Sequence, residues 1–218
     1  MLWERGNPFN PLCFARSARV ILLDAPTLFA NLPRGPVTRA LGFSAWVAVA
    51  LTASTLLSDA TQLSFDWSDA RTQRVVSLYG ISQLARQACQ TLGLVLLSAL
   101  GFHMITRCLG GRGSAVLAVR AAAYGSAFLL FNVLTTFAIT LAPPLELAAL
   151  IVSALTQSYL YFSCLCAAAV EHYGVSRARA ELAAGATVGM LVPAMFASTL
   201  LATLMSHRME RATAWLWQ

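Results

Sequence analysis

The sequence contains no lysine, and it has few charged residues of any kind. Charged side chains make up 11% of the 218 residues, while 58% of the residues are hydrophobic and the mean hydropathy is +0.66. A soluble domain has roughly 25% charged residues. Because this chain has too few charges to cover a soluble globule of its size, its composition predicts an integral membrane protein.

The positive net charge of +6 comes entirely from arginine. The arginines are scattered between apolar runs and form no single basic stripe, which argues against binding to nucleic acid. A chain rich in arginine and alanine but without lysine is typical of a GC-rich genome. This suggests a bacterial source, for which the inner (cytoplasmic) membrane is the expected location.

Patterns for metal binding, disulfides and catalysis are also missing. The five cysteines form no CxxC pair and no metal-ligand spacing. No Ser/His/Asp, Cys/His or paired-carboxylate spacing would bring two reactive groups together. We therefore expect no disulfide, metal or cofactor, and no enzymatic activity. The N-terminus also lacks the apolar run of a secretory signal, because Val20–Leu23 is too short, so the first span is expected to direct insertion.

Five apolar runs are long enough to cross a bilayer, which takes about 20 residues. They are Ala40–Leu57, Ala88–Thr106, Ala121–Ala142, Leu147–Val170 and Leu182–Ser206. The sequence thus predicts an all-α polytopic membrane protein with five transmembrane helices. Residues 40–206 form the membrane domain, residues 1–39 a cytoplasmic tail, and residues 207–218 a short external tail.

Two short amphipathic helices are expected in the tail, beginning near Phe14 and after Asp24. Their apolar faces and nearby arginines favour an N-terminal amphipathic interfacial helix at the membrane surface. Packing of the same helices against the bundle is an equal alternative. As a peptide, Phe14–Leu32 is expected to become helical on anionic vesicles.

Local signals predict how the spans are connected. Residues 59–87 read as a polar outer loop, although the second helix could begin on the membrane surface before its span. The short link at Pro143-Pro144 forces the third and fourth spans into an antiparallel hairpin. Gly174 is a helix stop, Ser176 caps the fifth helix, and a GxxxG at Gly185 and Gly189 predicts a close-packed helix face.

Arginine counts predict the orientation. Residues 1–39, 107–120 and 171–181 hold 5, 3 and 2 arginines, a total of 10 on one side. Residues 58–87, 143–146 and 207–218 hold 3, 0 and 2, a total of 5 on the other. Because cytoplasmic loops carry the excess of positive charge, the N-terminus is expected inside and the C-terminus outside.

The connector between the second and third spans holds the main candidate site. Its glycines Gly110, Gly111 and Gly113 are expected to let the loop fold back and leave unpaired backbone N–H groups near the arginines. Arg112 and Arg120 are expected at the cytoplasmic surface, with Tyr124 supporting them one turn below Arg120. Such a group suits a phosphate or carboxylate. The alternative is that these arginines only fix the topology.

Three motifs make the sequence similar to the Yip family (the Ypt-interacting-protein domain), in particular to its bacterial members, over residues 18–206. The motifs are Val20–Leu32 with Pro26 and Phe29, the connector Leu109–Ser114 followed by Arg120, Tyr124 and Ala127, and His172–Ser176 followed by Arg179 and Ala180. Phe128 stands where the family often has a proline, so a kink early in the third helix is not expected.

The resemblance implies a non-enzymatic membrane scaffold or adaptor. Eukaryotic relatives bind Rab-type GTPases in vesicle traffic, a partner that a bacterial chain would not have. The expected partners are therefore anionic lipid or an unidentified membrane or cytoplasmic protein, with a homo-oligomer possible. The candidate residues for binding a partner or lipid are Gly110, Gly111, Arg112, Gly113, Arg120, Tyr124 and His172.

A small transporter or lipid-moving protein is the alternative function. It would use polar groups inside the spans, namely Asn132, Gln157, Ser158, Tyr159 and Tyr161. None of these groups is ionised, whereas transporters usually carry a buried charge or broken helices near the midplane. Hydrogen bonding between helices is therefore the favoured role for these side chains.

Overall fold

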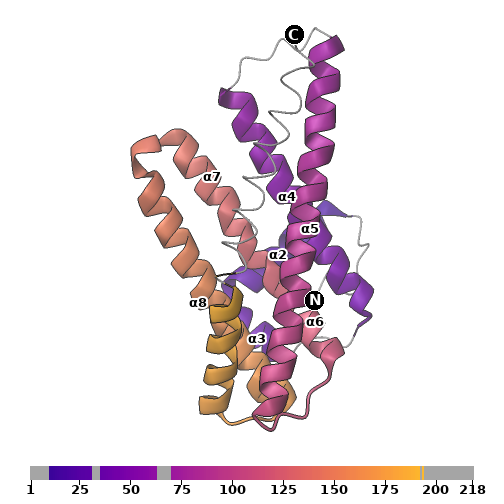
Figure 1. Ribbon diagram of the computed structural model, residues 1–218, viewed down its shortest axis with the longest axis vertical. Helices are drawn as coiled ribbons and strands as arrows, with labels where there is room; N and C mark the ends of the chain where they lie inside the picture. The colour runs from indigo at the N-terminus through magenta and orange to yellow at the C-terminus, as the bar shows by residue number, and fades with distance from the viewer. Residues whose placement is uncertain (1–9, 31–34, 63–69, 192, 194–218) are drawn as a thin grey trace.

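The computed structural model describes residues 10–30, 35–62, 70–191 and 193, and all its regular elements in these ranges are helices (Figure 1). In chain order they are α2 (Pro11–Leu23), α3 (Ala25–Ala30), α4 (Val37–Gln62), α5 (Ala70–Cys108), α6 (Ala115–Gly125), the 3₁₀ turn η1 (Ser126–Leu130), α7 (Phe131–Leu141), the 3₁₀ turn η2 (Pro143–Leu145) and α8 (Glu146–Tyr173). A further helix covers residues 177–191. The prediction of an all-α fold is confirmed.

Four helical segments are long and apolar enough to cross a membrane. They are Val37–Ser58, Ser77–Cys108, Ala115–Leu141 and Glu146–Tyr173. Each overlaps one of the first four predicted spans, which supports a multi-pass membrane protein. The fifth predicted span, Leu182–Ser206, begins in the helix at 177–191 and continues outside the described residues, so it stays a prediction.

In its described residues, 59–62 and 70–87, the polar stretch is helical, so its interpretation as a loop was wrong there. The alternative that the second helix begins well before its span is confirmed. Helix α4 continues to Gln62, and α5 already begins at Ala70. Residues 70–87 contain no proline and only one glycine, Gly80, so nothing in this stretch breaks a helix. Polar side chains mark exposure to water, and a helix that extends past the bilayer satisfies its own backbone hydrogen bonds.

The core lies where α4, α5, α6 and the lower part of α8 meet (Figure 1). Helix α6 places Ala118, Ala121 and Ala122 in this core, all nearly fully buried. Small side chains at these positions let the backbones approach closely, which is how helices pack in a membrane. The larger core residue Phe43 of α4 lies against Tyr124, with ring centroids 5.5 Å apart.

The third predicted span is not one continuous α-helix. Its α-helical pattern changes to 3₁₀ at Ser126–Leu130, although no proline occurs there. Two contacts lie at this change. The Ser126 hydroxyl donates to the Ala123 carbonyl at 2.6 Å and so competes with the helix hydrogen bonds. In addition, the Tyr161 ring lies so close to Gly125 that a Cβ there would stand 2.3 Å from Cε2 of that ring.

The link between α7 and α8 forms the predicted antiparallel hairpin. Helix α7 ends at Leu141, the turn η2 contains both prolines, and α8 begins at Glu146 (Figure 1). Helix α8 ends at Gly174, which has the left-handed φ of 66° expected of a glycine stop. The next helix starts at residue 177, and the N–H of Ala180 donates to the carbonyl of Ser176 at 2.9 Å.

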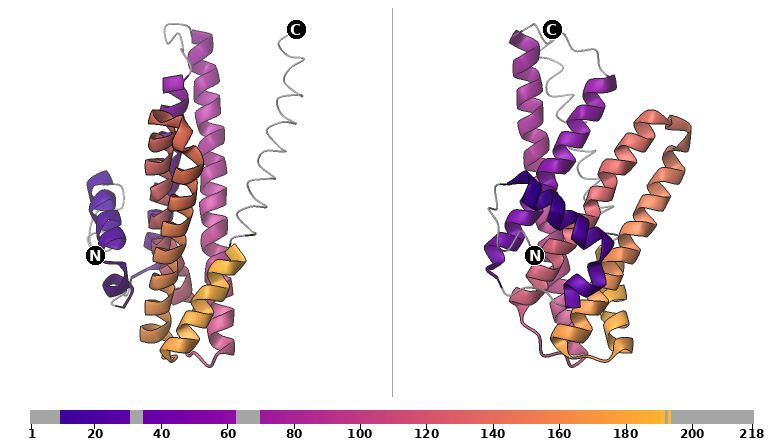
Figure 2. Two further views of the ribbon diagram at one scale, coloured as in Figure 1. Left: turned by 90° about the vertical axis from the view of Figure 1, so that its left-hand side faces the viewer. Right: turned by 180° about the vertical axis from the view of Figure 1, so that it is seen from behind.

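Helix α2 packs on the bundle with one face and leaves the other face open. Figure 2 shows it lying across the bundle helices rather than along them. Phe14 is buried, with its ring 5.1 Å from that of Phe43 and 5.9 Å from that of Trp46. On the opposite face, Leu12 and Arg16 are exposed. Packing therefore accounts for one face of α2, and contact of the other face with a membrane surface stays a prediction.

The predicted close packing at Gly185 and Gly189 is not found among the described residues. Both glycines are exposed. A Cβ at Gly185 would meet only Phe162, at an ordinary 3.7 Å, and a Cβ at Gly189 would meet nothing within 4 Å. The spacing alone was a weak signal because small residues are frequent throughout this chain.

Candidate functional site

The connector between α5 and α6 begins with a tight glycine turn. The N–H of Gly110 donates to the carbonyl of Arg107 at 3.0 Å, and the N–H of Gly111 donates to that of Thr106 at 2.9 Å. Gly110 has a φ of 92°, in the left-handed region that glycine adopts without strain. These bonds close the C-terminus of α5 as a Schellman-type cap. The predicted sharp turn at the glycines is confirmed.

The backbone N–H groups of Gly110 and Gly111 are bonded within the protein, so the prediction that they are unpaired was wrong. Besides the two glycine bonds, the N–H of Leu109 donates to Ile105 at 3.0 Å, and the N–H of Arg112 donates to Tyr173 at 3.0 Å. The turn uses these four amides for its own cap and for docking onto α8. These four amides are therefore not donors for an anion, and the exposed arginine side chains are the main candidates.

Tyr173, the last residue of α8, is the side chain around which the connector folds. Its ring is 2% exposed and lies edge-on to Phe102, with centroids 5.4 Å apart. Its hydroxyl donates to the carbonyl of Ser114 at 3.1 Å and lies 2.9 Å from Nδ1 of His103. Ring and hydroxyl together thus tie α5, the connector and α8 to one another.

Sequence reasoning did not single out Tyr173, which lies between His172 and Gly174 in one of the motifs. The signal that could have found it is the pair Gly111 and Gly113. A Cβ at Gly111 would lie 3.1 Å from Cβ of Tyr173, and one at Gly113 would lie 2.6 Å from its ring. Two glycines one residue apart indicate a large side chain packed against the turn.

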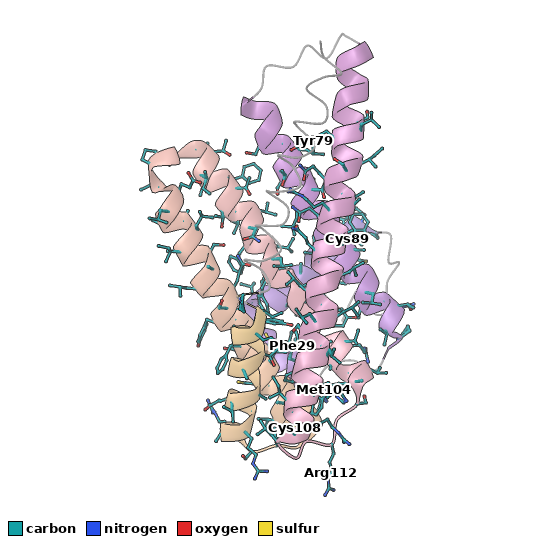
Figure 3. All side chains as sticks on the ribbon, in the orientation of Figure 1. Phe29, Tyr79, Cys89, Met104, Cys108 and Arg112 are labelled. Carbon is teal, nitrogen blue, oxygen red and sulfur yellow. The ribbon has the colours of Figure 1, made fainter. Side chains whose placement is uncertain are left out.

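Arg120 is not at the surface, so its predicted surface position was wrong, and Tyr124 below it is buried as well. Arg120 is 6% exposed, and Tyr124 is fully buried against Phe43. The two residues do share one helix face, as their spacing predicts, but α6 turns that face into the core with Ala121. Arg112, by contrast, is exposed and extends away from the end of the bundle in Figure 3.

His172 contacts the N-terminal helices and leaves part of its ring accessible. Its Nε2 lies 2.9 Å from the carbonyl oxygen of Phe29, a fully buried residue of α3. The histidine therefore joins the end of α8 to residues 25–30. Its predicted role in binding a partner or lipid stays a prediction.

The three segments that the arginine counts assigned to one side of the membrane meet at one end of the molecule. The main-chain N–H of Arg112 donates to the carbonyl of Tyr173. Arg179 Nη1 donates to the carbonyl of Leu109 at 3.1 Å. The contact between His172 Nε2 and the Phe29 carbonyl places the N-terminal segment at the same end. The turn at Pro143–Leu145 lies at the other end of its hairpin (Figure 1).

Four exposed arginines lie at this end, namely Arg107, Arg112, Arg177 and Arg179. We call Arg107, Arg112 and Arg179 together the arginine end. Arg177 pairs with Glu181 at 3.1 Å. Within the described part of the chain, the other three form no ion pair. The arginine end therefore carries positive charge that the described side chains do not neutralise.

Three of the five polar groups named for the spans, Asn132, Gln157 and Tyr161, hydrogen-bond to other helices, whereas Tyr159 is exposed. Gln157 Nε2 donates to Asn132 Oδ1 at 2.8 Å and to Ser153 Oγ at 2.7 Å, which joins α7 to α8. Tyr161 is hydrogen-bonded to Ser98 of α5. In the described ranges, no three His, Cys, Asp or Glu side chains gather closely enough to hold a metal ion.

Comparisons of the chain with protein-family models, with curated proteins and with solved structures found no match.

Proposed function

We propose that this chain is a non-enzymatic membrane scaffold of the Yip type that recruits a protein partner or anionic lipid at its arginine end. The observation that carries the proposal is the arginine end itself. Arg107, Arg112 and Arg179 are exposed there without an ion pair in the described residues, on and around a connector whose backbone is bonded to Tyr173. A fixed backbone lowers the entropy lost when a partner binds.

The proposal includes five spans with the arginine end in the cytoplasm of a bacterial inner membrane. It rests on the 10-to-5 division of the arginines and on the contacts that bring the three arginine-rich segments together. Reporter fusions within 143–146 and after Gln218 test it. Both fusions are expected to report an external position, and a cytoplasmic signal from both would contradict the topology.

The contacts inside the hairpin favour a scaffold over the alternative, a small transporter. Gln157 and Asn132, two of the groups that a transporter would use, are hydrogen-bonded to each other across α7 and α8. In this arrangement they hold the helices together, as polar side chains commonly do in membranes.

Affinity purification of the full chain from native membranes tests the proposed recruitment. The wild type is expected to retain a protein or an anionic lipid that the double variant Arg112→Gln/Arg179→Gln loses. The control for a protein partner is Arg16→Gln/Arg19→Gln, which also removes two exposed arginines but on α2. It does not serve for lipid, because α2 is itself predicted to contact anionic lipid. Equal retention by all three proteins would contradict recruitment at the arginine end.

A further inference from the structure

A surface hollow lies at the end of α5, beside the glycine turn. It is lined by Cys108, Leu109, Gly110 and Arg179 and has a volume of about 310 Å³. Its lining brings together two segments that are far apart in sequence, the connector and the helix at 177–191. The hollow is wide enough for a phosphate group together with part of the molecule that carries it.

Arg179 is held in place at this hollow. Its Nη1 donates to the carbonyl of Leu109 at 3.1 Å. A guanidinium has five N–H donors, so this bond fixes the group and leaves other donors for a ligand. With no ion pair among the described residues, the charge of Arg179 is also not neutralised there.

Gly110 keeps the space next to this guanidinium open. A Cβ at residue 110 would stand 3.4 Å from Nη1 of Arg179. A longer side chain would extend further toward the group that faces the hollow. The left-handed φ of 92° also favours glycine here, so the turn and the open space depend on the same residue.

A second arginine is fixed to the same turn. Arg107 Nη1 lies 3.4 Å from the carbonyl oxygen of Gly111, a long hydrogen bond that keeps the guanidinium beside the connector. Arg107 and Arg179 thus bond to carbonyls only two residues apart, from α5 and from the helix at 177–191. Arg107 is not part of the hollow lining, but both guanidinium groups are held at the same turn. A planar guanidinium suits a phosphate, which accepts two parallel hydrogen bonds from one arginine.

The position of the hollow along α5 favours a lipid headgroup over a soluble phosphate as the ligand. The membrane-crossing part of α5 ends at Cys108, the first residue of the lining. The hollow therefore lies at the end of the apolar segment, next to the connector, where lipid headgroups are expected. A headgroup is always present there at high local concentration, whereas a soluble phosphate must come from the aqueous phase.

We propose that this hollow binds the phosphate group of an anionic phospholipid, with Arg179 as the main ligand and Arg107 as the second. The inference rests on the proposed function, since it assigns a ligand and a place to recognition at the arginine end. It replaces the predicted pair Arg112 and Arg120, of which Arg120 is buried.

The test uses the purified full chain in a non-ionic detergent and calorimetric titration with three probes. They are short-chain phosphatidic acid, the matching diacylglycerol without phosphate, and inorganic phosphate. We expect the wild type to bind phosphatidic acid and not diacylglycerol, with inorganic phosphate binding more weakly than the lipid. Binding of inorganic phosphate as tightly as the lipid would show a free-anion site and overturn the lipid proposal.

Two variants of neighbouring arginines locate the site. Arg179→Gln is expected to weaken phosphatidic acid binding by roughly tenfold or more, because charge-assisted hydrogen bonds are lost. Arg177→Gln is the matched control because it removes the same charge from the same helix. Arg177 pairs with Glu181 and is not part of the hollow lining. It is expected to change binding less than about twofold.

Equal weakening by both variants would overturn the site, because it would show that general charge attracts the lipid. If Arg179→Gln does not fold, Arg179→Lys is measured instead, since it keeps the charge and loses the planar fork. Binding of phosphatidic acid to Arg179→Lys as tightly as to the wild type would also overturn the site. These results can be told apart from failure of the proposed function. Recruitment from native membranes can still fail or succeed independently of phosphatidic acid binding to the purified chain.

Discussion

Gly113 lies against the ring of Tyr173 so closely that a Cβ at residue 113 would stand 2.6 Å from three ring carbons. The glycine belongs to the connector and the tyrosine to the end of α8, 60 residues later in the numbering. Because Tyr173 is buried, its ring has little room to move. The connector therefore keeps its position only while residue 113 has no side chain.

Gly113→Ala is expected to destabilise the protein. The added methyl group must push the buried ring or the connector aside, and overpacking of this kind costs about 1–3 kcal/mol. The measurement is the free energy of unfolding in detergent. Gly93→Ala is the control, because a Cβ at Gly93 would meet nothing within 4 Å. Its helix position predicts no loss, and a loss in both variants would contradict the packing argument.

Tyr173→Phe is expected to lower the free energy of unfolding by about 0.5–1.5 kcal/mol. The change removes the hydroxyl that donates to Ser114 and lies beside His103, while the ring packing is kept. Tyr159→Phe removes the same hydroxyl from an exposed tyrosine and should leave stability unchanged. If the two variants unfold alike, the Tyr173 hydroxyl does not hold the connector.

Phe14→Ala is expected to release α2 from the bundle. Phe14 is buried between Phe43 and Trp46, and loss of a buried phenyl ring costs about 3–5 kcal/mol. Hydrogen exchange of residues 11–23 should therefore become faster, while exchange in α5 and α8 is kept. Leu12→Ala, on the exposed face of the same helix, should leave it protected. Unchanged protection in Phe14→Ala would mean that other contacts hold α2.

Gln157→Ala distinguishes the proposed scaffold function from the alternative transporter function. The variant loses the hydrogen bonds to Asn132 and Ser153, which should lower stability by about 0.5–2 kcal/mol. If the scaffold proposal is right, recruitment at the arginine end stays at the wild-type level. A loss of recruitment as large as that of Arg112→Gln/Arg179→Gln would place the functional groups inside the helical bundle instead.

Much of the fold could be predicted because its signals are local. Apolar runs mark the spans, Pro143-Pro144 marks the hairpin, and glycines mark both the connector turn and the end of α8. The stretch at 59–87 was mistaken for a loop because polarity was taken as a sign of irregular structure. Polarity reports contact with water, and a helix without breakers can continue into water.

The candidate site was predicted less well because it depends on contacts between distant segments. The spacing of Arg120 and Tyr124 shows that they share a helix face, but it cannot show that α4 covers that face. The contact between Leu109 and Arg179 also joins residues far apart in sequence, so no local pattern indicates it. Arg112 was placed correctly at the surface because it lies in the turn between two helices.

The central claim is that the arginine end recognises an anion and does more than fix the topology of the chain. It is tested most directly by the triple variant Arg107→Lys/Arg112→Lys/Arg179→Lys, purified from native membranes beside the wild type. Lysine keeps the positive charge that sets topology but lacks the planar fork of donors. Our account predicts that the variant inserts and folds like the wild type and loses the co-purifying partner or anionic lipid. Full retention of every co-purifying protein and lipid would contradict it and leave these arginines as topology signals.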